Sequence, residues 1–88
     1  MTYTVVLVRE EDGGYCVHVP ALRGCHTEGD TLPEALEMAR DAIECYLGSL
    51  AKHGERFPPD VATVTFDWED GTEALVYRVA VREAAAVA

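Results

Sequence analysis

The chain has 88 residues, 49% of them hydrophobic, and a net charge of −9 from 16 acidic and 7 basic residues. This length predicts one small domain spanning residues 1–88, with a single modest core. The charge argues against nucleic acid as a direct ligand, because phosphate binding needs clustered Lys and Arg. It fits a basic protein partner, and solubility alone is the alternative interpretation.

The termini and the cysteines indicate the compartment. The N-terminus lacks the basic start and apolar run of a secretory signal, and no apolar segment approaches the ~20 residues of a membrane helix. Cys16, Cys25 and Cys45 are odd in number and have no disulfide-framework spacing. We therefore expect a cytoplasmic protein with reduced thiols.

The N-terminal third of the chain predicts three strands. Residues 2–9 are rich in β-branched residues and almost continuously apolar, which indicates a strand covered on both faces. Residues 10–14 form an acidic turn ending in two glycines, which is typical of a hairpin, and residues 15–19 are the return strand. Pro20 ends that strand because it lacks a backbone donor, and a short third strand follows at 25–28.

A helix is the clearest element of the sequence. Thr31 followed by Glu34 matches a capping box, and Pro33 is tolerated in the first turn. Gly54, preceded by Lys52, is the expected C-cap. The apolar residues then follow helical spacing along one face: Leu32, Ala35, Leu36, Ala39, Ala42, Ile43, Tyr46, Leu47 and Leu50.

The remaining residues predict a hairpin after a stiff connector at 57–59. Residues 62–68 alternate as a strand does, 69–72 form a turn, 74–81 form a last strand, and 83–88 form a frayed tail. The predicted element order is thus β-β-β-α-β with one extra strand. We expect an α+β fold of two layers, with one helix across an antiparallel sheet.

Cysteine and histidine residues offer the first candidate chemistry. Cys16 and His18 share a strand face, and the next strand brings Cys25 or His26 nearby, so a tetrahedral zinc site is one reading. The spacing is not that of a known zinc motif, and alternation puts Cys25 and His26 on opposite faces. Structural cysteines and surface histidines are therefore the favoured interpretation, with no metal or cofactor. Cys–His catalysis lacks an orienting third group.

Acidic and aromatic residues near the second hairpin offer another candidate. The carboxylates of Asp67, Glu69, Asp70 and Glu73 could hold Mg²⁺ for phosphodiester hydrolysis, but turns favour Asp for local backbone reasons. Phe66 and Trp68 are expected in a core or an interface, since the acidic surroundings oppose base stacking.

One long pattern resembles a known family. From residue 14 to residue 43 the chain is similar to the HicB family of antitoxins, and with the first strand the match covers roughly two-thirds of the chain. The residues that carry the resemblance are Gly14, Tyr15, Val17, Val19, Pro20, Leu22, Gly24, Cys25, Thr27, Gly29, Asp30, Thr31, Leu32, Glu34, Ala35, Leu36, Ala39, Ala42 and Ile43.

The resemblance implies a partial ribonuclease-H-like fold without nuclease activity. It also implies a function, which is to bind and block HicA, a small basic mRNA-cleaving toxin with a double-stranded-RNA-binding fold. The motif residues are expected to be structural. For toxin contacts we expect exposed acidic residues of the first hairpin and the helix, namely Glu10, Glu11, Asp12, Glu37, Asp41 and Glu44.

The chain departs from the full-length family pattern after Pro59. Many HicB proteins carry a DNA-binding helix-turn-helix or ribbon-helix-helix domain there, whereas these residues predict an acidic hairpin. We therefore expect a form without that domain. Two other functions stay open, an orphan homo-oligomer (dimer or tetramer) with a regulatory or small-ligand role and a metal-dependent nuclease. The nuclease would need carboxylates converging on the sheet, and the first strand offers none.

Overall fold

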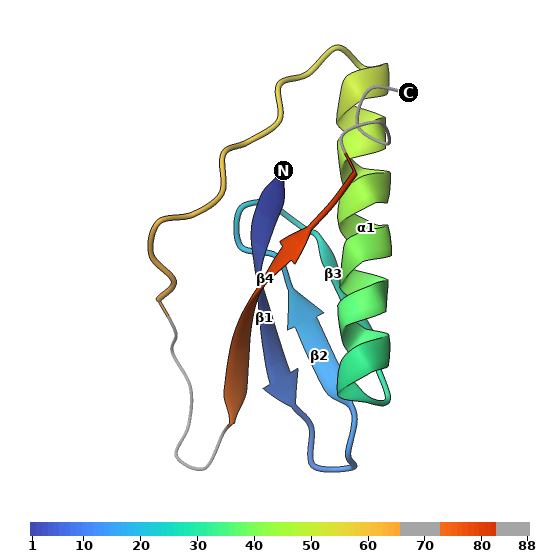
Figure 1. Cartoon of the computed structure of the whole chain (residues 1–88), viewed down its shortest axis with the longest axis vertical. Helices are drawn as coiled ribbons and strands as arrows, with labels where there is room; N and C mark the ends of the chain where they lie inside the picture. Colours follow the sequence, from blue (N-terminus) through green and yellow to red (C-terminus); the bar gives the residue numbers. More distant parts are fainter. Residues whose placement is uncertain (66–72, 83–88) are drawn as a thin grey trace.

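The computed structural model describes residues 1–65 and 73–82, and Figure 1 shows a sheet with one helix packed on one face. Within those residues the strands are β1 (Thr2–Arg9), β2 (Tyr15–His18), β3 (His26–Gly29) and β4 (Ala74–Ala80), and the helix is α1 (Leu32–Lys52). The sheet is antiparallel with the order β3-β2-β1-β4. The expected α+β fold with one helix across an antiparallel sheet is confirmed.

The central strand β1 is buried on both faces. It pairs with β4 along Thr2–Val8 but with β2 only from Val6 onward. Tyr3, Val5 and Leu7 point into the core beneath α1, and the residues between them are buried on the other face. The nearly continuous apolar run of β1 matches this double coverage, as expected from the sequence.

The helix packs through small residues. Ala35, Ala39, Ile43 and Leu47 are fully buried and recur at the spacing of one helical face. Alanine in the first half lets the helix axis come close to the sheet, and the larger Ile43 and Leu47 fill the space farther along. The core is therefore a single layer between α1 and the inner sheet face.

The helix ends are capped largely as the sequence indicates. The Glu34 backbone N–H donates to the Thr31 hydroxyl over 3.2 Å. The Glu34 carboxylate accepts from the Asp30 N–H instead of the Thr31 N–H, so the reciprocal bond forms one residue earlier than in a standard capping box. At the other end His53 is the cap, and Gly54 follows it with a φ of +68° that suits glycine.

Strand boundaries differ from the prediction at four places, of which one is the last strand, which ends at Ala80 and not at residue 81. The second strand ends at His18 and not at Val19, and the third covers His26–Gly29 and not residues 25–28. Residues 62–65 do not form the expected strand, while the rest of that prediction, residues 66–68, lies outside the described residues.

The connector after α1 is attached to the sheet by side chains. The Tyr3 hydroxyl donates to the Pro58 carbonyl, and Asp60 accepts two hydrogen bonds from Thr4. This segment contacts β1 through side chains and not through a strand ladder, since β1 pairs with β2 on one side and with β4 on the other. Residues 62–65 accordingly form no strand with β1. The turn expected at 69–72 and the tail at 83–88 lie outside the described residues.

Candidate partner-binding site

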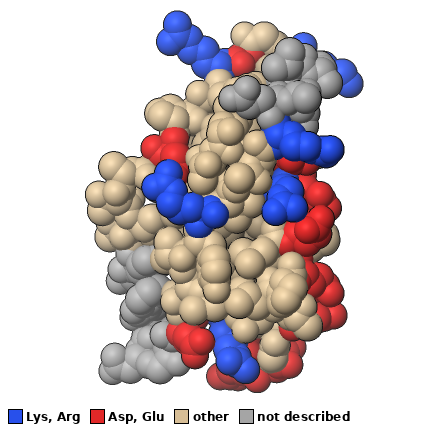
Figure 2. Space-filling model, in the orientation of Figure 1, with Lys and Arg blue, Asp and Glu red and all other residues tan. Residues whose placement is uncertain are grey.

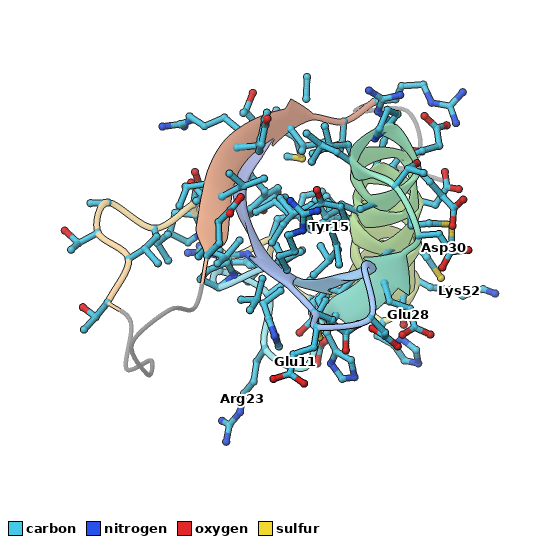
Figure 3. All side chains as sticks on the ribbon, turned by 90° about the horizontal axis from the view of Figure 1, so that it is seen from below. Glu11, Tyr15, Arg23, Glu28, Asp30 and Lys52 are labelled. Carbon is cyan, nitrogen blue, oxygen red and sulfur yellow. The ribbon has the colours of Figure 1, made fainter. Side chains whose placement is uncertain are left out.

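Carboxylates from three segments line a surface hollow of about 460 Å³ beside the start of α1. We call this feature the acidic hollow. It is lined by Glu10, Asp12, Gly14, Glu28, Gly29, Asp30, Glu34 and Met38. Figure 3 shows Glu28 and Asp30 on the side of the molecule where β3 lies against α1, and Figure 2 shows acidic side chains along the helix edge and the lower end of one face.

Local backbone chemistry brings these carboxylates together. The first hairpin closes through hydrogen bonds from Glu10 N–H to the Gly14 carbonyl and from Gly13 N–H to the Glu10 carbonyl. Gly13 has a φ of +101°, a conformation that L side chains rarely adopt. Tyr15 then pairs with Gly29, so the hairpin ends beside the turn from β3 into α1. Acidic groups at that turn are stabilised by the positive end of the helix dipole.

Met38 gives the acidic hollow an apolar contact. Its side chain is 40% exposed, one of the few large hydrophobic residues at the described surface. Interfaces typically combine an apolar centre with a polar rim, and methionine is enriched in them. The acidic hollow therefore combines carboxylates with one exposed apolar side chain.

A second hollow of about 520 Å³ lies between α1 and the end of β4. It is lined by Glu37, Arg40, Asp41, Glu44, Ala80, Val81 and Arg82. Arg82 donates to Glu44 from its backbone N–H over 3.1 Å and from its guanidinium over 3.2 Å. These bonds, the backbone bond first, lower the pKa of the Glu44 carboxyl. The charges of this second hollow are thus partly satisfied within the chain.

The six acidic residues expected to contact a partner do not lie together in the structure. Glu10 and Asp12 line the acidic hollow, whereas the three from α1, Glu37, Asp41 and Glu44, line the second hollow. Glu11 is exposed on the first hairpin and lines neither.

Four side chains that line the acidic hollow are not among the contacts that the sequence predicts: Glu28, Asp30, Glu34 and Met38. The sequence predicts Glu34 only as a capping and motif residue. Its nearness to the hairpin depends on strand pairing across the intervening chain, which no local pattern shows.

The motif residues occupy the corner between β2, β3 and α1. Leu22, Cys25 and Ala35 are buried in the core. The turn between β2 and β3 is closed by a hydrogen bond from Val19 N–H to the Cys25 carbonyl, and Gly24 has a φ of +80° there. Tyr15 packs at the edge of the core, and Thr27 lies opposite Val17 in the ladder between β2 and β3; Pro20, Asp30 and Thr31 are exposed.

The cysteines and histidines lie on different faces of the sheet. Cys16 Sγ is 3.8 Å from His18 Nε2 on the outer face, and the His18 and His26 ring centroids are 6.4 Å apart. Cys25 lies on the helix side, where burial, and secondarily Cys45, raise the pKa of its thiol. Among the described residues, no group of three or more metal-ligating side chains could hold a metal ion.

The second acidic cluster is only partly described. Glu73 is exposed just before β4, while Asp67, Glu69 and Asp70 lie outside the described residues, as do Phe66 and Trp68. In the described part of the chain, no helix has the length and apolar character required to cross a membrane.

Comparison with known families identifies the family to which the chain belongs. Residues 3–83 match the family model described as the HicB-like antitoxin of a bacterial toxin-antitoxin system. The chain belongs to this HicB-like antitoxin family. The resemblance carried by residues 14–43 is therefore confirmed, and the match continues through the connector into β4.

Curated relatives agree with the family assignment. The chain is 52% identical over 62 residues to a UPF0150 protein of Thermoplasma acidophilum, covering 70% of this chain and 90% of that protein. It is 41% identical over 58 residues to Antitoxin HicB 1 of Photorhabdus laumondii, covering 66% of this chain and 37% of that antitoxin.

Solved structures share the fold. One chain of a toxin–antitoxin complex from Streptococcus pneumoniae matches with a TM-score of 0.78 at 19% identity, over 96% of this chain and 70% of that one. The Burkholderia pseudomallei antitoxin HicB matches with a TM-score of 0.71 at 23% identity, over 97% of this chain and 66% of that one. A chain of the HicA3 and HicB3 toxin–antitoxin complex matches with a TM-score of 0.65 at 18% identity, over 93% of this chain and 99% of that one.

Proposed function

We propose that this HicB-like antitoxin is a non-catalytic binding protein that sequesters a small basic toxin of the HicA type, an mRNA-cleaving enzyme. The observation that carries the proposal is the acidic hollow, which is lined by five carboxylates and an exposed methionine on a chain of net charge −9. Two proteins of the same fold are described as parts of toxin–antitoxin complexes, which supports a toxin partner.

Charge explains how such a partner would be captured. An acidic patch accelerates encounter with a basic protein and disfavours partners of like charge. Glu10, Glu28 and Asp30 are exposed and make no ion pair among the described residues, so their carboxylates are free to meet Lys and Arg. Glu34 is also oriented, because it already accepts the Asp30 N–H.

Charge reversal in the acidic hollow is expected to weaken toxin capture. We expect the double variant Glu10→Lys/Glu28→Lys to bind the small basic protein encoded beside its gene about 10- to 100-fold more weakly, mainly through slower association. Co-expression followed by affinity measurement at low and physiological salt checks this, and the loss should be larger at low salt.

A matched control separates the site from overall charge. The double variant Glu55→Lys/Glu73→Lys changes the net charge by the same amount at two exposed residues outside the acidic hollow. It should keep most of the affinity and still relieve toxin-induced growth arrest. Equal losses in both variants would contradict a specific site, and the absence of any complex with the wild-type chain would contradict toxin capture itself.

A further inference from the structure

The strand β4 lies at a free edge of the sheet within the described residues. Hydrogen bonds at both ends of its pairing, from Arg9 N–H to the Glu73 carbonyl and from Val81 N–H to the Met1 carbonyl, involve odd-numbered residues of this segment. Because main-chain groups alternate in direction along an antiparallel strand, the even-numbered residues of β4 direct their N–H and C=O groups away from β1.

Of the usual protections against pairing, this edge has only one charged residue, Arg78, which is held in an ion pair with Asp60. β4 is seven residues long and contains no proline, whereas the opposite edge strand β3 has four residues and includes Glu28. Val76 is 52% exposed and Tyr77 is 37% exposed. Natural proteins protect edge strands with short length, charges, bulges or proline, so a long apolar edge is suited to pairing with another strand.

The helix leaves part of β4 uncovered. Tyr77 pairs with Val5 and lies on the helix side of the sheet, yet Val5 is fully buried while Tyr77 remains well exposed. The reason is the position of α1, which packs mainly on β3 and β2 (Figure 1). Apolar surface is thus left on both faces of β4, at Val76 on the outer face and at Tyr77 on the inner face.

Charge indicates which partner fits this edge. β4 carries no carboxylate, and its one charged residue is Arg78, which bridges to Asp60 over 3.3 Å. A basic toxin would gain nothing electrostatically here, whereas two copies of an acidic chain repel least where carboxylates are missing. The strand is therefore suited to a second copy of this chain.

We infer that β4 pairs antiparallel with β4 of a second copy across a two-fold axis, so that the two sheets become one continuous sheet. The two-fold symmetry and the alternating direction of the main-chain groups allow few registers for the pairing of β4 with its copy. The register centred on Tyr77, the midpoint of Ala74–Ala80, pairs every residue of the strand. It sets Tyr77 opposite its own copy and Val76 opposite Arg78, whereas a centre on Arg78 would oppose two like charges.

Lysine at the edge tests this interface in the full chain. Sedimentation and light scattering should give the wild type a mass of twice 9.6 kDa or a higher even multiple. Val76→Lys should halve that mass, because lysine at an exposed edge position opposes strand pairing. Met38→Lys makes the same change at another exposed hydrophobic residue, on α1, and should keep the wild-type mass.

Far-UV circular dichroism checks that both variants stay folded. A monomeric wild type at all concentrations would overturn the inference. So would a Val76→Lys variant that keeps the wild-type mass, or a mass lost equally in both variants.

A disulfide test checks the register independently of any folding defect. In a background in which the two cysteines not fully buried are replaced, Cys16→Ser/Cys45→Ser, Tyr77→Cys should form an intermolecular disulfide under mild oxidation. Directly opposed residues in a non-hydrogen-bonded pair are close enough for this bond. Val76→Cys, which faces Arg78 of the second copy, should crosslink much less. Equal crosslinking, or none with Tyr77→Cys, would overturn the proposed register.

Discussion

Gly29→Ala is expected to lower the free energy of unfolding by about 3 kcal/mol, the upper part of the range for overpacking. A Cβ at Gly29 would lie 2.6 Å from both the backbone N and Cα of Ala35. Both residues are buried where the end of β3 meets the first turns of α1. Because the obstruction is helix backbone, a side-chain rotation cannot relieve it, and strand and helix must separate. Thermal denaturation should show a fall of more than about 10 °C in melting temperature.

Two further variants isolate this contact. Gly24→Ala places a Cβ in open space but at a φ of +80°, so it should cost only the strain of about 1–2 kcal/mol. Ala35→Gly added to Gly29→Ala should not restore stability, because the closest atoms belong to the backbone. A Gly29→Ala variant as stable as Gly24→Ala, or one rescued by Ala35→Gly, would show that the helix is free to move off the strand.

Asp60→Ala is the second large effect and is expected to lower the free energy of unfolding by about 2–3 kcal/mol, the upper part of the range of about 1.5–3 kcal/mol for hydrogen bonds to a charged group. The Thr4 backbone N–H donates to Asp60 Oδ1 and the Thr4 hydroxyl donates to Oδ2, both over 2.8 Å. Thr4 is only 6% exposed, so removal of the carboxylate leaves two buried donors without a partner. The variant also frees Arg78, whose exposed ion pair contributes little.

The position of this carboxylate in the sheet explains its importance. β2 pairs with β1 only as far as Val6, and Pro20 follows the end of β2. Thr4 pairs with Arg78 of β4 at an even-numbered position, so its N–H points to the side that β2 no longer reaches. Asp60 supplies the acceptor that a longer strand would have provided.

A pH series checks the same contact. Burial alone would raise the pKa of the Asp60 carboxyl, but hydrogen bonds from Thr4 and Val61 and the charge of Arg78 outweigh it, so the pKa lies below its ordinary value. A depressed folded pKa gives stability that is present above the unfolded value near 4 and lost as the pH falls through the folded value.

Asp60→Asn should therefore lose less stability than Asp60→Ala at neutral pH, because its amide oxygen still accepts a hydrogen bond. It should also show a shallower loss of stability in acid than the wild type. An unchanged acid slope in Asp60→Asn would contradict the role given to this carboxylate.

The sequence predicted elements whose causes are local. The strand β1 follows from its β-branched run, and the start of α1 follows from Thr31 and Glu34, whose hydrogen bond forms as expected. The prediction failed at 62–65, where the residues alternate like a strand but pair with no strand of the described sheet. Alternation shows only that a segment suits a sheet, whereas pairing depends on where the chain path and contacts such as those of Asp60 with Thr4 hold the segment.

The sequence by itself determined the α+β class, the capped helix, the turn glycines and the resemblance to an antitoxin family, because each depends on residues close together along the chain. Only the tertiary structure decided that Glu10 and Glu34 line one hollow, that Asp60 completes the ladder at Thr4, and that β4 forms an edge. These relations join residues more than 20 positions apart, and they arise from the packing of α1 and the order of the strands.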